Sequence, residues 1–294
     1  MAITATMVKE LRERTGVGMM ECKKALTEAN GDMDAAVEIL RKKGTAKADK
    51  RADKIAAEGT IACVNDGTKA ALVEVNCETD FVAKEDDFVA FANAVAVTIN
   101  QQQPDSIDAL NAMTLYGGNV SVEAARTGLI TKIGENMTVR RFSVMAAQEG
   151  EKISDYVHTG SRIAVLVHSR GGRDDLGRDI AMHIAHSKPL CIDKGGVPEE
   201  LVAKERAVAE AQAKESGKPA NIIEKMVEGK LQKFLNEVSL MGQSFVKDPD
   251  QTIEKLLKTE NAEVLGFVRY EVGEGIEKKK DDFVAEVMAQ AKGA

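Results

Sequence analysis

The pattern of strand and helix signals in the middle of the chain occurs twice, and this repetition constrains the fold more than any other feature. In the first pass, residues 61–64 and 71–75 are apolar except for Glu74, and they flank the turn sequence Asn65-Asp66-Gly67, which is typical of a β-hairpin. A helix with one apolar face is then predicted by the helical spacing of Phe88, Phe91, Ala92, Val95 and Ile99. We expect this stripe to face the core.

The second pass begins near residue 140. Residues 139–147 and 161–168 are predicted strands, and residues 179–186 open a helix. Shifting one half by 92 positions superposes four apolar pairs, Val73 on Val165, Val75 on Val167, Phe88 on Ile180 and Ala92 on Ile184. This similarity indicates an internal duplication of a strand, strand, helix unit. The fold class is therefore predicted to be α+β, with a duplicated core of two antiparallel-sheet subdomains.

Helical segments lie on both sides of this core. Residues 4–43 predict three short helices that form a module with a small core. The Ala- and Lys-rich residues 42–58 predict a solvated, partly helical linker, and an RNA-contacting patch is the alternative. Residues 198–235 predict two helices joined by the tight turn 216–219, which makes an antiparallel hairpin that projects from the body.

The remaining residues complete this organisation. Residues 252–257 predict a short helix, residues 263–272 a strand that completes the second sheet, and residues 281–291 a terminal helix. The chain then divides into a three-helix module with its linker at 1–54, a first core subdomain at 55–140, a second core subdomain at 141–275 with the hairpin inserted at 191–238, and a C-terminal helical module at 276–294.

A short connection between the first hairpin and its helix carries the residues best suited to function. Thr79, Asp80, Phe81 and Val82 place an aromatic ring beside a carboxylate, and connections on a rigid scaffold are where function concentrates. Phe81 lies outside the helical stripe, and the matching connection of the second copy, residues 171–174, has no aromatic residue. This difference favours an exposed ring. The alternative is that Phe81 and Val82 cap the core while Asp80 satisfies the helix start.

Composition excludes several classes of protein. The 294 residues exceed what one core usually supports, so we expect two or more modules. No apolar run approaches the roughly 20 residues of a membrane span, and the N-terminal residues do not resemble a secretory signal. A net charge of −7 argues against a dedicated nucleic-acid binder. The four cysteines occur singly, which indicates reduced thiols and a cytoplasmic location.

Candidate catalytic and metal sites are weak. Residues 172–179 have the spacing of a phosphate-binding loop, but Arg178 and Asp179 replace the Lys and Ser/Thr that would reach the phosphates and the magnesium. His183 and His186 stand three residues apart on a predicted helix, with no third ligand near them in sequence. We therefore predict no catalytic residue and no bound metal.

A second candidate surface lies around the connection between the first two predicted helices. Met19 and Met20 follow the turn at residues 15–18, and Arg12 and Lys23 flank it. Methionine is common at protein-binding surfaces. The alternatives are a half-buried core position for the two methionines and a solvated helix face for the two basic residues.

Residues 11–26, 74–84 and 132–137 resemble bacterial translation elongation factor Ts. The similarity runs essentially end to end, and it includes the predicted hairpin and the segment at 272–277. Residues 101–130 carry no motif of that family that we recognise. The resemblance implies a guanine-nucleotide exchange factor that binds elongation factor Tu in its GDP state, promotes GDP release by disturbing the magnesium and phosphate site, and lets GTP rebind during translation elongation.

Further expectations follow from the same resemblance. The factor needs no cofactor, because the GDP and Mg²⁺ on which it acts are held by the partner, and no direct nucleic-acid or membrane binding is expected. The N-terminal module resembles a ubiquitin-associated (UBA-like) fold that docks on the nucleotide-binding domain of elongation factor Tu. The hairpin is a coiled-coil element for dimerisation, as a homodimer or a 2:2 complex, or for additional contacts. The terminal helix adds another contact.

The resemblance also implies roles for single residues. We expect Phe81 to insert between partner helices, with Val82 extending the apolar contact, Asp80 perturbing the magnesium-water network and Thr79 fixing the loop by hydrogen bonding. Other partner contacts are expected on the base side of the nucleotide-binding domain, from Arg12, Met19, Met20 and Lys23, and elsewhere on the partner, from Ile133, Gly134 and His158.

Two other functions stay open on the sequence. An adaptor that binds ubiquitin-like surfaces would carry its whole activity in residues 1–54. An enzyme acting on nucleotides would bind GDP or GTP itself, and the missing phosphate-binding loop counts against it.

Overall fold

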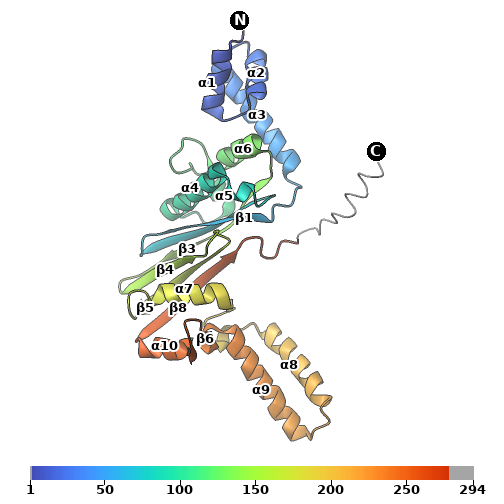
Figure 1. Cartoon of the computed structure of the whole chain (residues 1–294), viewed down its shortest axis with the longest axis vertical. Coiled ribbons are helices and arrows are strands. Elements are labelled where there is room, and N and C mark those ends of the chain that lie inside the picture. The colour runs from blue at the N-terminus through green and yellow to red at the C-terminus, as the bar shows by residue number, and fades with distance from the viewer. Residues whose placement is uncertain (1, 278–294) are drawn as a thin grey trace.

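The computed structural model describes residues 2–277 and shows an α+β protein with N-terminal helices and small antiparallel sheets. Two three-stranded sheets, with strand orders β1-β2-β3 and β4-β5-β8, form the centre of the molecule (Figure 1). Three helices lie at one end of these sheets and a hairpin of two helices lies at the other. None of the described helices combines the length and apolar content that crossing a membrane requires.

The N-terminal bundle consists of α1 (Ala5–Thr15), α2 (Met19–Glu28) and α3 (Met33–Arg51). The Thr4 hydroxyl and the Asp32 carboxylate accept hydrogen bonds from backbone N–H groups in the first turns of α1 and α3, as expected of helix caps. The predicted apolar stripes meet in a small core made of Val8, Leu11, Val17, Cys22, Ala25, Leu26, Ala36 and Leu40.

The third helix is longer than predicted. Residues 42–51 are helical and mostly exposed, as expected for the partly helical linker, but α3 continues through them without a break and buries Gly44 and Ala48, so this part is not wholly solvated. A Cβ on Gly44 would lie 2.8 Å from the Thr131 hydroxyl, so α3 approaches its neighbour closely here. Packing against α6 therefore stabilises a helical segment that composition alone predicts to be a solvated linker.

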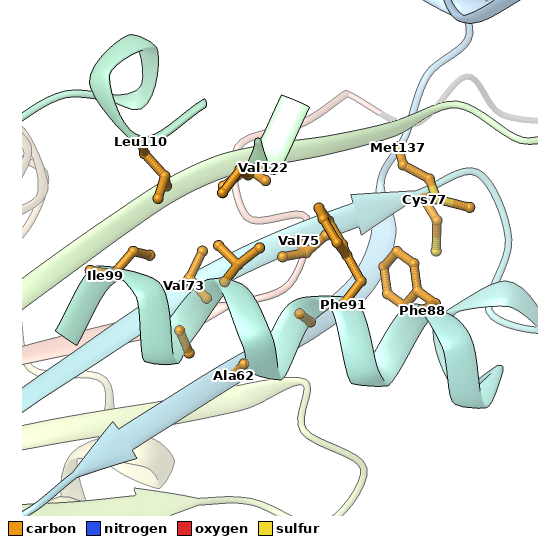
Figure 2. Packing of buried hydrophobic residues seen from close by; sticks show 14 of the residues in the cluster. Ala62, Val73, Val75, Cys77, Phe88, Phe91, Ile99, Leu110, Val122 and Met137 are labelled. Atoms are coloured by element: carbon orange, nitrogen blue, oxygen red, sulfur yellow. The ribbon is translucent and has the colours of Figure 1, made fainter. Parts of the chain in front are cut away.

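The first sheet contains β1 (Glu58–Asn65), β2 (Lys69–Cys77) and β3 (Met137–Ala146), and α4 (Asp86–Gln102) packs on it. The predicted turn joins β1 to β2, where Asp66 accepts hydrogen bonds from the N–H groups of Thr68 and Lys69. Figure 2 shows the predicted stripe of α4, including Phe88, Phe91 and Ile99, facing the apolar side chains of the sheet. The helix starts at Asp86, and Glu85 precedes it without a side-chain cap hydrogen bond.

Residues 101–130, which have no recognised motif, fold onto this unit. They contribute α5 (Ile107–Ala112) and most of α6 (Val122–Ile133). Leu110 of α5 and Val122 of α6 are fully buried in the core beside α4 (Figure 2).

The second sheet contains β4 (Glu151–Val157), β5 (Ile163–Gly171) and β8 (Ala262–Glu271), and α7 (Leu176–Ser187) packs on it. Its core also receives side chains from η3 (Leu240–Gly242), the short strand β6 (Ser244–Phe245) and α10 (Ile253–Thr259), and β7 (Asp248–Thr252) pairs with β6. The predicted short helix and final strand are thus confirmed.

The two halves divide at a different place from the one predicted. The strand predicted at 139–147 was assigned to the second repeat, but β3 pairs with β2 and completes the first sheet. A boundary between residues 140 and 141 would fall inside β3. The first strand of the second sheet is β4, which was not predicted. In both sheets the second strand in chain order is central, and a helix follows it.

The two sheets pack against each other through the faces that α4 and α7 leave free. Apolar side chains from both sheets fill the space between them: Ile61, Ala70, Leu72, Ile153, Ala164, Leu166, Tyr270 and Val272. A fully buried carboxylate, Glu74 of β2, fastens the same interface, since it pairs with Arg140 and Arg141 and accepts the N–H of Gly273 at 2.8 Å.

The helical hairpin is formed by α8 (Glu199–Lys214) and α9 (Ala220–Val238), as predicted, and η2 (Lys194–Gly196) precedes it. Two backbone hydrogen bonds close its neck, from the Leu190 N–H to the Val238 carbonyl (2.8 Å) and from the Leu240 N–H to the Cys191 carbonyl (2.9 Å). Figure 1 shows the hairpin extending away from the sheets. The predicted terminal helix at 281–291 lies outside the described residues.

Candidate functional site

Phe81 stands on the connection between β2 and α4 and is exposed. Its fractional exposure of 78% exceeds that of every other large apolar residue in the described part of the chain. The ring sits at the start of η1 (Val82–Lys84), a single turn that leads into α4. The alternative in which Phe81 caps the core is therefore wrong. A ring that is 78% exposed keeps apolar area in contact with water, and a partner surface that covers the ring removes this area from water, which is favourable.

The loop that carries Phe81 is fixed by Thr79. The Thr79 N–H and hydroxyl donate hydrogen bonds to the Glu135 carboxylate at 3.0 and 2.7 Å. The Thr79 hydroxyl also accepts the N–H of Val82 at 3.4 Å, and the Cys77 thiol donates to the Thr79 carbonyl at 3.1 Å. Burial raises the pKa of Cys77 to about 12, so the thiol keeps the proton that it donates. The predicted hydrogen-bonding role of Thr79 within the loop is thus observed.

Val82 points in the opposite direction from the one expected. Only 7% of this residue is exposed, and it packs in the core beneath α4. The expectation that Val82 extends the apolar contact area of Phe81 is therefore not supported, because its side chain is already covered. Val82 instead anchors the turn on which the Phe81 ring is carried.

Asp80 lies next to the ring and carries a charge. Its carboxylate pairs with the Lys84 ammonium at 2.7 Å, one helical turn away. The hydrogen bond from Lys84 holds the pKa of Asp80 below its ordinary value, and attraction to Arg162 contributes to the same shift. Asp80 is therefore an exposed, ionised carboxylate at neutral pH, and the ion pair with Lys84 is weak enough to exchange partners.

Two further predicted residues lie at the base of this loop. Ile133 ends α6, and Gly134 is its left-handed cap with φ 92°. The next residue in the chain is Glu135, which holds Thr79. The structure thus brings Ile133 and Gly134 to the same place as the Phe81 loop.

The predicted surface on the N-terminal bundle is separate from this loop. Met20 is 65% exposed, so the half-buried alternative does not hold for it, whereas Met19 is 42% exposed and thus about half buried. Arg12 and Lys23 are exposed beside them, and within residues 2–277 neither side chain has an ion-pair partner. Arg12 lies on α1 and the other three residues lie on α2, and all four are exposed.

His158 lies neither on the Phe81 loop nor on the N-terminal bundle. It lies on the turn between β4 and β5, where its Nδ1 atom is 2.9 Å from the Tyr156 hydroxyl. With His186 and Lys188 it borders a cavity of about 410 Å³ on the second half of the molecule.

The weak catalytic and metal candidates have structural explanations. Asp179 pairs with Arg173 and with Lys247, so the segment at 172–179 holds its own charges together. His183 is buried between the side-chain Oε1 atom of Gln243 (2.9 Å from Nε2) and the Val246 N–H (3.2 Å from Nδ1). Among the described residues, no three His, Cys, Asp or Glu side chains gather as a metal site would require.

Sequence reasoning missed the two carboxylates that fasten the loop, Glu78 and Glu135. Glu78 accepts the N–H of Asn136 at 2.6 Å, and Glu135 accepts the N–H of Thr79. Both lie inside stretches that resemble the exchange factors, but no periodicity or spacing links residues 56 positions apart in the chain.

Comparisons with known proteins show the family of the chain. Residues 78–274 match the family model described as elongation factor TS. Elongation factor Ts of Thioalkalivibrio sulfidiphilus and that of Methylococcus capsulatus are each 58% identical over 296 aligned positions, covering 100% of both chains. The protein of the same name from Nitrosomonas eutropha is 58% identical over 290 positions, covering 98% of this chain and 97% of its own. The chain therefore belongs to the elongation factor Ts family, the translation factors that exchange the guanine nucleotide of elongation factor Tu.

Proposed function

We propose that this exchange factor promotes GDP release by inserting the Phe81 ring between two helices of elongation factor Tu beside the nucleotide site. As a member of its family, the chain is a nucleotide exchange factor of the bacterial cytoplasm and not an enzyme, and it needs no cofactor of its own. The observation that carries the proposal is the exposure of a large aromatic ring on a loop whose base is rigidly hydrogen-bonded.

A wedge of this kind suits the way in which a GTPase holds GDP. Backbone N–H groups of a glycine-rich loop surround the phosphates, and a magnesium ion bridges them. Packed helices respond to an inserted side chain by discrete shifts, so one ring can displace both the glycine-rich loop and the magnesium ion. By linkage, a factor that weakens nucleotide binding must itself bind more weakly when nucleotide is present.

Asp80 is the group that acts on the magnesium side. It is exposed, ionised at neutral pH and adjacent to the ring. On docking, its carboxylate leaves Lys84 and perturbs the waters or residues that hold the partner's magnesium. The exchange costs little, because exposed ion pairs are screened by water and contribute little to stability.

A second contact comes from the N-terminal bundle. Met19 and Met20 supply adaptable apolar area, and Arg12 and Lys23 supply two cations that have no partner in the described chain. These residues dock on the base side of the nucleotide-binding domain. Ile133 and Gly134 extend the contact beside the wedge, and His158 reaches the partner from the second half.

The finer architecture belongs to the same proposal. We infer that residues 1–54 form a UBA-like module and that the two sheet units arose by duplication, which is supported by their shared strand order. The boundary between the core subdomains then falls in the turn between β3 and β4. The hairpin at 191–238 serves in dimerisation or in further partner contacts, and residues 276–294 form the terminal module.

The test is the release of fluorescent mant-GDP from elongation factor Tu, followed by stopped flow. Phe81→Ala should lower the stimulated rate by at least about 30-fold, as expected for the loss of a central aromatic contact. Tyr116→Ala is the matched control, because it removes another exposed ring (53%) that lies near the opposite end of α4. Equal stimulation by the folded Phe81→Ala protein and the wild type would refute the wedge.

A further inference from the structure

The base of the Phe81 loop is fastened by a clasp of two carboxylates. β2 and β3 make their last ladder pair at Cys77 and Met137. Immediately beyond it, Glu78 accepts the N–H of Asn136 at 2.6 Å, and Glu135 accepts the N–H of Thr79 at 3.0 Å. Each strand end thus supplies one carboxylate to the backbone of the other, so side chains continue the ladder where backbone pairing stops. We call Glu78, Thr79, Glu135 and Asn136 the clasp.

The clasp is also attached to the end of α3. The Arg51 guanidinium donates to both oxygens of Glu78, at 3.1 and 3.3 Å. The Asn136 side-chain amide donates to the Lys54 carbonyl at 2.7 Å. The Glu78 side chain is 19% exposed, so this charge-assisted pair is better shielded than a surface ion pair. The chain that leaves α3 is therefore tied to the residue from which the Phe81 loop begins.

Through α3, the clasp is connected to the N-terminal bundle. α3 runs from Met33 to Arg51 without a break, with its first half in the bundle core and its second half against α6. The Lys47 ammonium donates to the Thr131 carbonyl at 3.3 Å, which adds to the close approach at Gly44. A continuous helix transmits the position of one end to the other. The surface that carries Met19 and Met20 is thus mechanically linked to Arg51.

We propose that Glu78 is a positioning residue for nucleotide exchange, because it links the docked orientation of the N-terminal bundle to the Phe81 loop. This inference rests on the proposed wedge function. When the bundle is docked, α3 fixes Arg51, Arg51 fixes Glu78, and the clasp fixes the backbone from which Phe81 projects. Without the link, the bundle still docks, but the ring occupies its productive position in a smaller fraction of the complexes.

Two substitutions separate this role from simple binding. Glu78→Gln keeps an oxygen acceptor for the Asn136 N–H and removes the charge that pairs with Arg51, whereas Arg51→Met breaks the same pair from the α3 side. Each should lower the maximal rate of mant-GDP release at saturating factor by about three- to tenfold. The factor concentration for half-maximal rate should change by less than about twofold, since the docking surfaces are intact. Arg41→Met is the control, because it removes an exposed pair with Glu38 (3.7 Å) on the same helix and should change neither value.

A double substitution provides the decisive outcome. In the Phe81→Ala background, Glu78→Gln should cause no further loss of rate, because a residue that acts through the ring has no effect once the ring is gone. An equal loss in both backgrounds, or a normal maximal rate for Glu78→Gln and Arg51→Met, would overturn the positioning role. A normal rate for Phe81→Ala would overturn the wedge itself, whereas a slow Phe81→Ala with a normal Glu78→Gln would overturn the positioning role alone.

Discussion

The connections that follow the central strands of the two sheets hold very different residues. β2 leads to α4 through eight residues, 78–85, and β5 leads to α7 through four, 172–175. The first presents the exposed Phe81 ring, whereas the second has no aromatic residue. Because the flanking strand and helix have the same arrangement in both units, the comparison isolates what the connection itself contributes.

The second connection forms ion pairs with neighbouring parts of the second half. Arg173 pairs with Asp179 and with Glu260 at 3.3 Å, and Lys247 pairs with Asp179 at 2.6 Å. Burial raises the pKa of Asp179, but the hydrogen bonds from Lys247 and Arg173 outweigh it and hold the pKa below its ordinary value. The second connection is therefore held by its own ion pairs, and the proposed exchange function belongs to the first connection rather than to the repeated scaffold.

The largest expected effect contrasts two phenylalanines seven positions apart. Phe88 lies on the buried face of α4 and is fully buried, so Phe88→Ala should lower the free energy of unfolding by about 3–5 kcal/mol. Phe81→Ala should change it by no more than about 0.5 kcal/mol, because the ring is exposed. Urea unfolding of both variants measures the difference. A large loss of stability for Phe81→Ala would mean that its ring is buried in solution.

A smaller loss is expected at the last residue of β5, next to the second connection. Gly171 has φ +73°, and a Cβ there would lie 2.3 Å from the Asn261 carbonyl oxygen. Gly171→Ala should destabilise the protein by about 2–4 kcal/mol through strain and the backbone clash. Gly67→Ala is the control, because Gly67 has φ +91° with open space around it and should show only the conformational cost of about 1–2 kcal/mol. Equal losses in the two variants would mean that the Asn261 carbonyl oxygen does not crowd Gly171.

The third prediction weakens the clasp in the first connection. Thr79→Val keeps the shape of the side chain but removes the hydroxyl that donates to Glu135 and accepts from Val82. The free energy of unfolding should fall by about 1–2 kcal/mol, and exchange should fall with it because the loop is less ordered. Hydrogen exchange of the backbone amides in the loop provides the measurement. Unchanged protection would show that the hydroxyl does not hold the loop.

A smaller effect concerns pH and the second half of the molecule. Burial lowers the pKa of His183, so the folded protein holds this imidazole neutral. The unfolded chain takes up a proton near the ordinary value of 6.5, so the contribution to stability is complete above that pH and is lost as the pH falls below it. Unfolding measured at about pH 7.5 and about pH 5.5 should show this loss in the wild type and a reduced loss in His183→Gln. An identical pH dependence in the two proteins would show that His183 does not contribute to the pH dependence of stability.

Much of the fold could be predicted because its signals are local. The spacing of Phe88, Phe91 and Ile99 identifies α4, and the sequence Asn65-Asp66-Gly67 identifies the β1–β2 turn. β4 was missed because it is an edge strand with few strongly apolar residues, of which only Ile153 is buried. The partner of β3 could not be assigned, because strand pairing depends on residues distant in sequence.

The candidate site could be predicted only in part for the same reason. Phe81 was identified by a contrast between the two halves, which is a property of the sequence. The depth of Val82 and the bonds from Thr79 to Glu135 depend on how β2, α6 and α4 meet, and no pattern in the chain records that geometry.

The most direct test of the account is the affinity of the Phe81→Ala protein for elongation factor Tu in its GDP-bound and nucleotide-free forms. The wild type should bind the nucleotide-free form far more tightly, because linkage makes that ratio equal to the weakening of GDP binding. Phe81→Ala should bind the GDP-bound form about as well as the wild type and lose most of its preference for the nucleotide-free form. If Phe81→Ala weakened both complexes by the same factor, the ring would be an ordinary contact and the wedge account would be wrong.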